Sequence, residues 1–192
     1  LFNKCGFKRL RKLILTKSIN INDNNLKELL QNIDRLEYLD LYFNKNITDE
    51  GLKNLSKVTH LELFSNENIT DDALKYLTNI KHLDLSLNTN ITDYGLKYLT
   101  NINVLDLSSN DNITDQGLKY LSKVTHLILE NDENITDEGL KYLTNITHLD
   151  LFSNENITDE GLKNLNKDIK VLNIRNCKNI TNEGIKYLNK DM

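Results

Sequence analysis

Cysteine is nearly absent from this chain, which has two among its 192 residues, Cys5 and Cys177. They lie at opposite ends of the sequence, whereas a disulfide requires Cα atoms within about 7 Å of each other. In a row of stacked repeats, with neighbouring strands about 4.8 Å apart, the two thiols are separated by far more than this. An intrachain disulfide is therefore excluded, and two unpaired thiols favour a reducing compartment.

Long apolar runs and an excess of positive charge are also missing. No stretch approaches the roughly 20 apolar residues that span a bilayer, and no signal-peptide pattern follows Leu1. Because the chain does not start with Met, we expect that an upstream segment has been removed. The net charge of −4 and the pI near 5.6 argue against a general nucleic-acid binder, whose affinity depends on neutralising phosphates. We expect neither a membrane nor a nucleic-acid partner.

The chain consists almost entirely of one repeated block of 22 residues. An apolar strand position recurs at that spacing in Leu41, Leu63, Leu85, Leu107, Leu129 and Leu151, and Ile174 follows after 23 residues. The first copy is longer, at 26 residues. We divide the repeat domain, residues 10–192, into eight units: 10–35, 36–57, 58–79, 80–101, 102–123, 124–145, 146–168 and 169–192. Residues 1–9 remain as an N-terminal flank or the remnant of an upstream segment.

The pattern L-x-x-L-x-L-x-x-N in these units resembles that of leucine-rich repeat proteins. The second half of each unit, as in residues 113–121, resembles the cysteine-containing subclass found in F-box/leucine-rich-repeat proteins. In that subclass Cys often replaces the Asn, as Cys177 does here. The resemblance implies an α/β fold, namely a curved solenoid with a parallel β-sheet on the concave face and short helical or 3-10 segments on the convex face.

The apolar pattern favours a solenoid on physical grounds as well. Each unit offers about six inward positions, each stabilising by about 1.5–3 kcal/mol when fully buried. In one unit these are Val58, Leu61, Leu63, Ile69, Leu74 and Leu77. A single unit cannot bury them, but stacking places each position against its equivalent in the next unit, so a continuous core forms.

Three further columns of the repeat have structural explanations. The Asn column can satisfy backbone groups in the turn, because a carboxamide both donates and accepts hydrogen bonds. Thr48 and Asp49, with their copies, precede the second apolar segment and are expected to cap a short helix. The Gly column accepts Ala73, so we expect it to require a small side chain rather than a positive φ angle.

The outward strand positions form three columns on the predicted concave face, and function is expected there. The first contains Tyr38, Val104 and all four histidines, and the second is mostly acidic. The third mixes aromatic, hydroxyl and charged side chains. The candidate partner-binding residues are Tyr38, Asp40, Tyr42, His60, Glu62, Phe64, His82, Asp84, Asp106, His126, Glu130, His148, Asp150, Phe152 and Arg175.

Four acids follow one another in consecutive units of the second column: Asp40, Glu62, Asp84 and Asp106. At a spacing of about 4.8 Å, like charges are expected to raise one another's pKa values and to form a negative groove. Protonation of the neighbouring histidines is expected to reduce the groove's negative charge as the pH falls through about 6.5. We interpret the groove as the binding site of a basic protein or peptide, with Tyr38, Tyr42, Phe64 and Phe152 as anchors. Recent duplication, without selection for a ligand, could also have produced these columns.

Three other functions remain open. Two His with one acid is a zinc-type set, and His60, His82 and Glu62 or Asp84 could supply it, as could His126, His148 and Asp150. An open sheet provides few second-shell partners, so we expect no metal, no cofactor and no catalysis. The family resemblance implies a ubiquitin-ligase adaptor if an F-box lies upstream, since residues 1–9 cannot contain one. Uncapped terminal repeats also invite end-to-end homo-association.

Two more features concern location and local variation. Asn-Ile-Thr recurs in nearly every unit, where glycans would crowd one another. We therefore expect a cytoplasmic location, or a host's cytoplasm for a viral or effector protein.

Unit 124–145 departs most from the pattern, with Ile128, Glu130 and Asp132 at divergent positions. An ionised Asp132 cannot donate the hydrogen bond of a carboxamide, so a looser turn is expected. Drift or a partner-specific patch around Ile128 and Glu130 would explain the divergence.

Overall fold

A computed structural model describes residues 7–18 and 20–188, and its eight strands form one parallel sheet in sequential order. Each strand has three residues: β1 Lys12–Ile14, β2 Tyr38–Asp40, β3 His60–Glu62, β4 His82–Asp84, β5 Val104–Asp106, β6 His126–Ile128, β7 His148–Asp150 and β8 Val171–Asn173. Residues at equivalent repeat positions pair directly, as Leu61 pairs with Leu83. The sequence alignment of the units is therefore also the register of the sheet.

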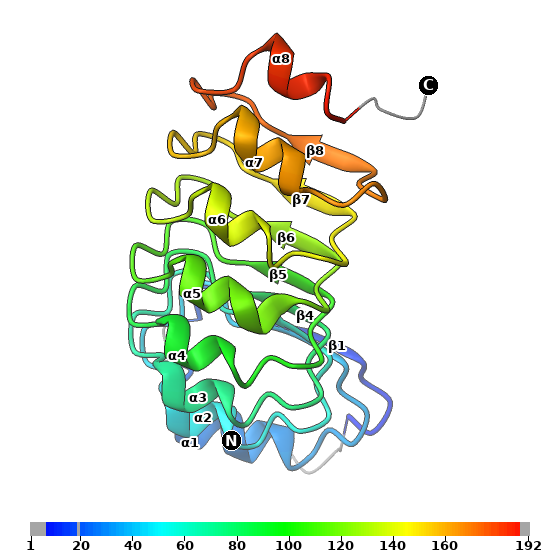
Figure 1. Ribbon diagram of the computed structural model, residues 1–192. Coiled ribbons are helices and arrows are strands. Elements are labelled where there is room, and N and C mark those ends of the chain that lie inside the picture. Colours follow the sequence, from blue (N-terminus) through cyan, green and yellow to red (C-terminus); the bar gives the residue numbers. More distant parts are fainter. Residues whose placement is uncertain (1–6, 19, 189–192) are drawn as a thin grey trace.

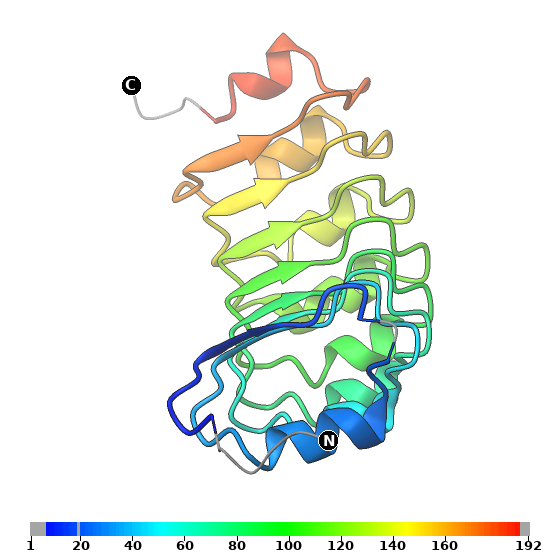
Figure 2. The ribbon, with the colours of Figure 1, turned by 180° about the vertical axis from the view of Figure 1, so that it is seen from behind.

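Short helices cover the side opposite the sheet (Figure 1). They are α1 Asp23–Leu30, α2 Asp49–Leu52, α3 Asp71–Leu74, α4 Asp93–Leu96, α5 Asp115–Leu118, the 3-10 helix η1 Lys119–Leu121, α6 Asp137–Leu140, α7 Asp159–Asn164 and α8 Asn182–Ile185. The units stack into a curved solenoid with the sheet on its concave face, as the reverse view in Figure 2 shows. The predicted α/β leucine-rich repeat solenoid is confirmed. The longer α1 belongs to the first unit, whose extra residues lengthen it.

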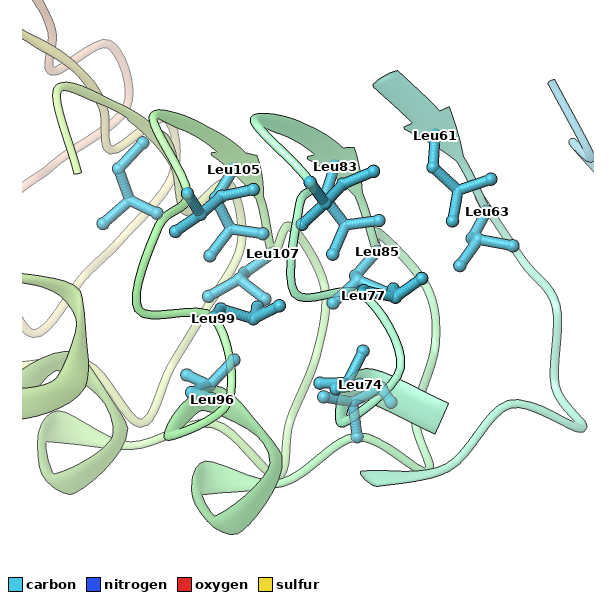
Figure 3. Packing of buried hydrophobic residues seen from close by; sticks show 14 of the residues in the cluster. Leu61, Leu63, Leu74, Leu77, Leu83, Leu85, Leu96, Leu99, Leu105 and Leu107 are labelled. Atoms are coloured by element: carbon cyan, nitrogen blue, oxygen red, sulfur yellow. The ribbon is translucent and has the colours of Figure 1, made fainter. Parts of the chain in front are cut away.

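The core is a stack of equivalent leucines between the sheet and the helices. Leu61, Leu83 and Leu105 lie side by side in one row, and Leu74 and Leu96 lie in a second row beneath them (Figure 3). All five are buried, with at most 3% of their surface exposed. Neighbouring units therefore supply the burial that no unit achieves alone.

The Asn column forms a buried ladder between units. The side-chain amide of Asn88 donates to the carbonyl oxygen of Leu63 at 2.8 Å, and its Oδ1 accepts from the backbone N–H of Asn66 at 3.0 Å. Cys177 takes the same place in the last unit, where Sγ donates to the Leu151 carbonyl at 3.0 Å. Its thiol is free and buried, and Cys5 lies outside the described residues. The structural role predicted for this column is confirmed.

The turn of unit 124–145 keeps the conformation of the other copies, so the prediction of a looser turn was wrong. Asn131 has a φ of 57°, close to the 57° of Ser109 in the preceding unit. The backbone N–H of Asp132 donates to Oδ1 of Asn154 at 2.7 Å, and its Oδ1 accepts from the N–H of Asn110 at 3.0 Å. Neighbouring rungs of the ladder hold the turn, although Asp132 replaces the amide.

A second ladder links the helix starts, and the sequence did not reveal it. Each Thr caps its own helix, as Thr92 Oγ1 accepts from the N–H of Tyr94 at 3.2 Å. The same Thr donates its N–H and its hydroxyl to the two oxygens of Asp71 in the preceding unit, at 2.8 and 2.6 Å. The prediction that Thr caps the helix is confirmed, whereas the Asp binds the next unit instead.

This ladder also explains the column of small residues. A Cβ placed on Gly117 would lie 2.4 Å from Oδ1 of Asp93, the carboxylate that binds the next unit's helix start. Among the described residues no glycine has a positive φ, as expected. The column therefore keeps space for the carboxylate, and at Ala73 a methyl group is accommodated.

The positive φ angles fall instead on eight non-glycine residues, one in each unit, just before the Asn column. They are Lys17, Phe43, Ser65, Leu87, Ser109, Asn131, Ser153 and Asn176. The left-handed conformation costs roughly 1–2 kcal/mol in a residue with a side chain, and Asn adopts it more readily than others. Phe43 at 58° and Leu87 at 56° are thus costly choices for this position.

Two adjacent acids of α3 provide a test of the helix ladder. We expect Asp71→Ala to lower the free energy of unfolding by about 1–3 kcal/mol, because it leaves the Thr92 N–H and hydroxyl without their acceptor. Asp72→Ala is the matched control, since it removes a similar charge from the same helix turn but only an exposed ion pair to Lys75, costing less than about 1 kcal/mol. Urea denaturation of both variants measures the difference. Equal losses would contradict the role assigned to the ladder.

Candidate functional site

The outward side chains of the strands lie in register on one surface, which we name the sheet face. Pairing places Asp40 beside Glu62, Glu62 beside Asp84 and Asp84 beside Asp106. We name these four residues the acid row. The next position in the row is Ile128, which ends it on β6. The four acids predicted to be neighbours are therefore brought together on β2 to β5.

Each acid of the row also has a local hydrogen-bond partner. Oδ1 of Asp84 accepts from the backbone N–H and the hydroxyl of Ser86, and Oδ1 of Asp106 accepts in the same way from Ser108. Tyr38 donates its hydroxyl to Glu62 at 3.3 Å. These contacts hold the carboxylates in place.

Burial, more than mutual repulsion, sets the acidity of the row. The partly buried position of Asp84 raises its pKa to about 6, against the bonds from Ser86, and the nearby Asp106 and Glu62 add to the rise. Burial is also the largest cause of the raised pKa values of Glu62 and Asp106. We predicted raised pKa values from like charges. The direction was correct for Glu62, Asp84 and Asp106, but desolvation contributes more than repulsion.

The histidines form two stacked pairs beside the acids. The rings of His60 and His82 have centroids 4.0 Å apart, and those of His126 and His148 lie 3.9 Å apart. Burial, followed by the neighbouring histidines, lowers the pKa of His82, and burial and then His148 lower the pKa of His126. Each of these two rings therefore gains its proton at a lower pH than an ordinary histidine does. Their protonation is shifted below the predicted pH of about 6.5, and protonation of Asp84 near pH 6 also reduces the negative charge of the acid row.

The predicted aromatic anchors do not form one group. Tyr42 and Phe64 stack with centroids 4.4 Å apart, and Phe43 meets both rings edge-on, at 4.8 and 5.3 Å. Phe152 lies three or more units away and is covered by the Arg175 guanidinium, 5.5 Å above its ring. The sequence indicated Tyr42 and Phe64 but missed Phe43, because its column is polar in most other units.

The remaining predicted residues occupy the ends of the sheet face. Tyr38 lies between the amine of Lys12, 4.0 Å from its ring centroid, and the ring of His60, 6.3 Å away. At the other end, both oxygens of Asp150 accept from the Asn173 amide at 2.9 Å. Burial, followed by the charges of Asp150 and Asp106, raises the pKa of Glu130. Asp150 and Arg175 are thus separated from the acid row by Ile128, whereas Glu130 lies close enough to Asp106 to be affected by its charge.

A metal set was one of the alternatives drawn from the sequence. Within the part of the chain that the structure describes, no group of three or more His, Cys, Asp or Glu side chains is arranged to hold a metal ion. The two His pairs instead stack ring against ring. The His and acid columns alternate along each strand, but they do not converge on one point. Every helix among the described residues is too short or too polar to cross a membrane.

Solved structures resemble the whole solenoid. Internalin InlF from Listeria monocytogenes is 28% identical with a TM-score of 0.70, over 94% of this chain and 52% of that chain. Internalin C2 from the same organism is 29% identical with a TM-score of 0.65, over 88% and 77% of the two chains. The TLR13–ssRNA13 complex shares the fold, with 21% identity and a TM-score of 0.68 over 91% of this chain and 29% of that one. The chain thus spans less than two thirds of the InlF and TLR13 chains.

Sequence comparison identifies the family. No curated protein matches the chain. The family described as "Leucine Rich repeat" matches residues 36–56, 54–77, 76–99, 98–122, 142–165 and 166–188. The gap between these matches falls on the divergent unit 124–145. Scaffolds of this kind typically serve protein–protein interaction. The chain belongs to the leucine-rich repeat family.

Proposed function

We propose that this protein is a non-enzymatic scaffold that binds a basic segment of a protein partner through the acid row on its concave sheet face. The main observation that supports this proposal is that Asp40, Glu62, Asp84 and Asp106 lie in register on four adjacent strands. Their fixed carboxylates present a line of hydrogen-bond acceptors, and Arg and Lys are the side chains that match such acceptors. Stacked rings flank this line on both sides of the strands.

A protein fits this surface better than a nucleic acid does. One solved relative of the fold is a complex with single-stranded RNA, but the acid row here would repel phosphates rather than neutralise them. The net charge of −4 acts in the same direction. The shallow, open sheet face also lacks the enclosed site with converging polar groups that catalysis favours.

Charge reversal tests the proposal. With a short fluorescein-labelled peptide of alternating Arg and Ser as probe, we expect Asp84→Lys and Asp106→Lys each to weaken binding at least about tenfold, or about 1.4 kcal/mol. Asp111→Lys, in an exposed turn away from the row, is the matched control. Binding to the unmodified protein should also weaken as the pH falls from about 7.5 to about 5, because protonation neutralises Asp84. Fluorescence anisotropy at low salt measures both effects. Unchanged affinity in the two row variants would exclude this site.

A cytoplasmic location is part of the same proposal. From Asn68 onward, the Asn of each Asn-Ile-Thr triplet uses its amide in an inter-unit bond, as Asn68 donates to the Lys45 carbonyl at 2.7 Å and Asn90 to the Glu67 carbonyl at 2.6 Å. N-glycosylation modifies this same nitrogen. Glycans would thus disturb a bond that recurs along the solenoid, which supports an environment without glycosylation.

Two narrower forms of the proposal have less support. An F-box adaptor role requires an F-box in the same polypeptide, and Cys177, which points to that subclass, has the bonding role of the usual Asn. End-to-end association stays a prediction, supported by the partly exposed Leu172 and Ile174 of the last unit.

A further inference from the structure

We propose that the partner segment also inserts an aromatic or large aliphatic side chain against a hydrophobic rim formed by Tyr42, Phe43, Phe64 and Leu87. This inference rests on the proposed function, because the rim borders the acid row. It adds a second recognition element in units 36–57, 58–79 and 80–101, which carry three of the four residues of the acid row. The sequence alone indicated aromatic anchors spread from Tyr38 to Phe152.

The two rim residues that precede the Asn column are unusual choices for their backbone conformation. Phe43 and Leu87 occupy the left-handed position that Ser or Asn fills in five of the other six units. Leu87 exposes 40% of its surface, so it contributes little to the core. A bulky, exposed side chain in a conformation that disfavours it points to a role outside the fold.

The rim spans three units. Tyr42 and Phe64 stack, and Phe43 packs edge-on against both. Leu87 lies two units beyond Phe43 in the same column, at a Cα separation of about 10 Å from the strand spacing. Between them Ser65 is 9% exposed, whereas the equivalent Ser109 and Ser153 are more exposed. Ser65, between two large residues of its column, is thus more buried than its equivalents.

Charge complementarity defines the occupant. Asp40 and Glu62 lie two residues before Tyr42 and Phe64, at about 7 Å along the chain. An extended segment crossing the face can therefore place Lys or Arg on the acid row and an apolar side chain on the rim two residues away. The rim ends at Leu87, because Ser109 and Asn131 follow in its column. The acid row ends one unit later, after Asp106, where Ile128 replaces an acid. The acid row and the rim thus both lie in the N-terminal half of the sheet face.

A display library of random extended peptides, selected on the intact chain, tests this inference separately from the proposed function. We expect enrichment of Lys or Arg two residues from an aromatic or large aliphatic residue. Enrichment of basic residues without the apolar partner would overturn the rim and leave the acid row supported. Enrichment of neutral or acidic sequences, or of none, would overturn both.

Matched variants then locate the apolar contact. Against a selected peptide, Leu87→Asn should weaken binding about tenfold, whereas Ser109→Asn, the same column outside the rim, should change it less than about twofold. Both should raise the denaturation midpoint, because Asn tolerates the left-handed conformation. A merely structural Leu87 would instead lower the midpoint and leave affinity unchanged. Equal affinities of the two variants would contradict the inference.

Discussion

Asp132→Asn is expected to raise the free energy of unfolding by about 2–4 kcal/mol at about pH 8.5, and to leave it nearly unchanged at about pH 4. Burial raises the pKa of Asp132 to about 7, from an ordinary value of 3.8, with bonds from Asn110 and Ser109 opposing the rise. The acid therefore stabilises the fold most when protonated. That stability is fully present below pH 3.8 and is lost as the pH rises to about 7. The interval between these two values corresponds to about 4 kcal/mol.

The contacts of Asp132 also indicate that Asn at this position stabilises the fold more than an ionised Asp does. Asp132 is 1% exposed, and its Oδ2 is one of the buried oxygens without a hydrogen-bond partner among the described residues. In the equivalent place, Asn154 donates its amide to the Leu129 carbonyl at 2.6 Å. Asn at position 132 could donate likewise to Leu107, whereas an ionised carboxylate cannot donate.

Urea denaturation at several pH values, with the variant compared with the unmodified protein at each, isolates this one group. Glu133→Gln is the control, because it removes an exposed acid from the same turn. A stability gain that does not depend on pH would show that Asp132 keeps its ordinary pKa in the fold. A loss of stability in Asp132→Asn would contradict the ladder itself.

The same core substitution is expected to have very different effects at two places in the stack. Leu105→Ala should lower the free energy of unfolding by about 2–5 kcal/mol, because Leu105 is completely buried between two units. Leu172→Ala, in the same column of the last unit, should cost less than about half as much. Leu172 packs against one described unit and remains partly exposed.

Denaturant unfolding followed by far-UV circular dichroism measures both changes, and hydrogen exchange locates them. For Leu105→Ala we expect faster exchange on β4 to β6, whereas Leu172→Ala should affect β8 alone, since repeat stability is a sum of nearest-neighbour terms. Similar losses in the two variants would mean that the solenoid unfolds as one cooperative body.

The sequence predicted the parts of the structure that depend on period alone. Equal spacing of Leu61, Leu83 and Leu105 fixes which residues pair, so the sheet register and the neighbours in the acid row followed directly. Alternation within each strand also separated inward leucines from outward acids. Grouping of the concave residues was predictable for the same reason.

The rest depends on geometry that periodicity does not contain. Asp71 binding to the next unit requires the distance between helix starts, which a one-dimensional pattern lacks. The left-handed backbone conformation of Phe43 could not be predicted from the sequence either, because aromatic residues rarely have a positive φ angle. The acidity of Asp84 depends on how deeply its strand is covered. The sequence shows where these residues stand in the repeat, but their contacts, backbone angles and acidity depend on the three-dimensional packing.

The helix ladder has a consequence for how such a molecule can change in length. Every internal unit presents an Asp to its successor and a Thr to its predecessor, so each interface uses the same donors and acceptors. Unequal recombination between near-identical repeats adds or removes a whole block of 22 residues. Such an exchange leaves every donor opposite an acceptor at the new junction. Gain or loss of repeats can therefore extend or shorten the binding surface in steps of one strand while the architecture is preserved.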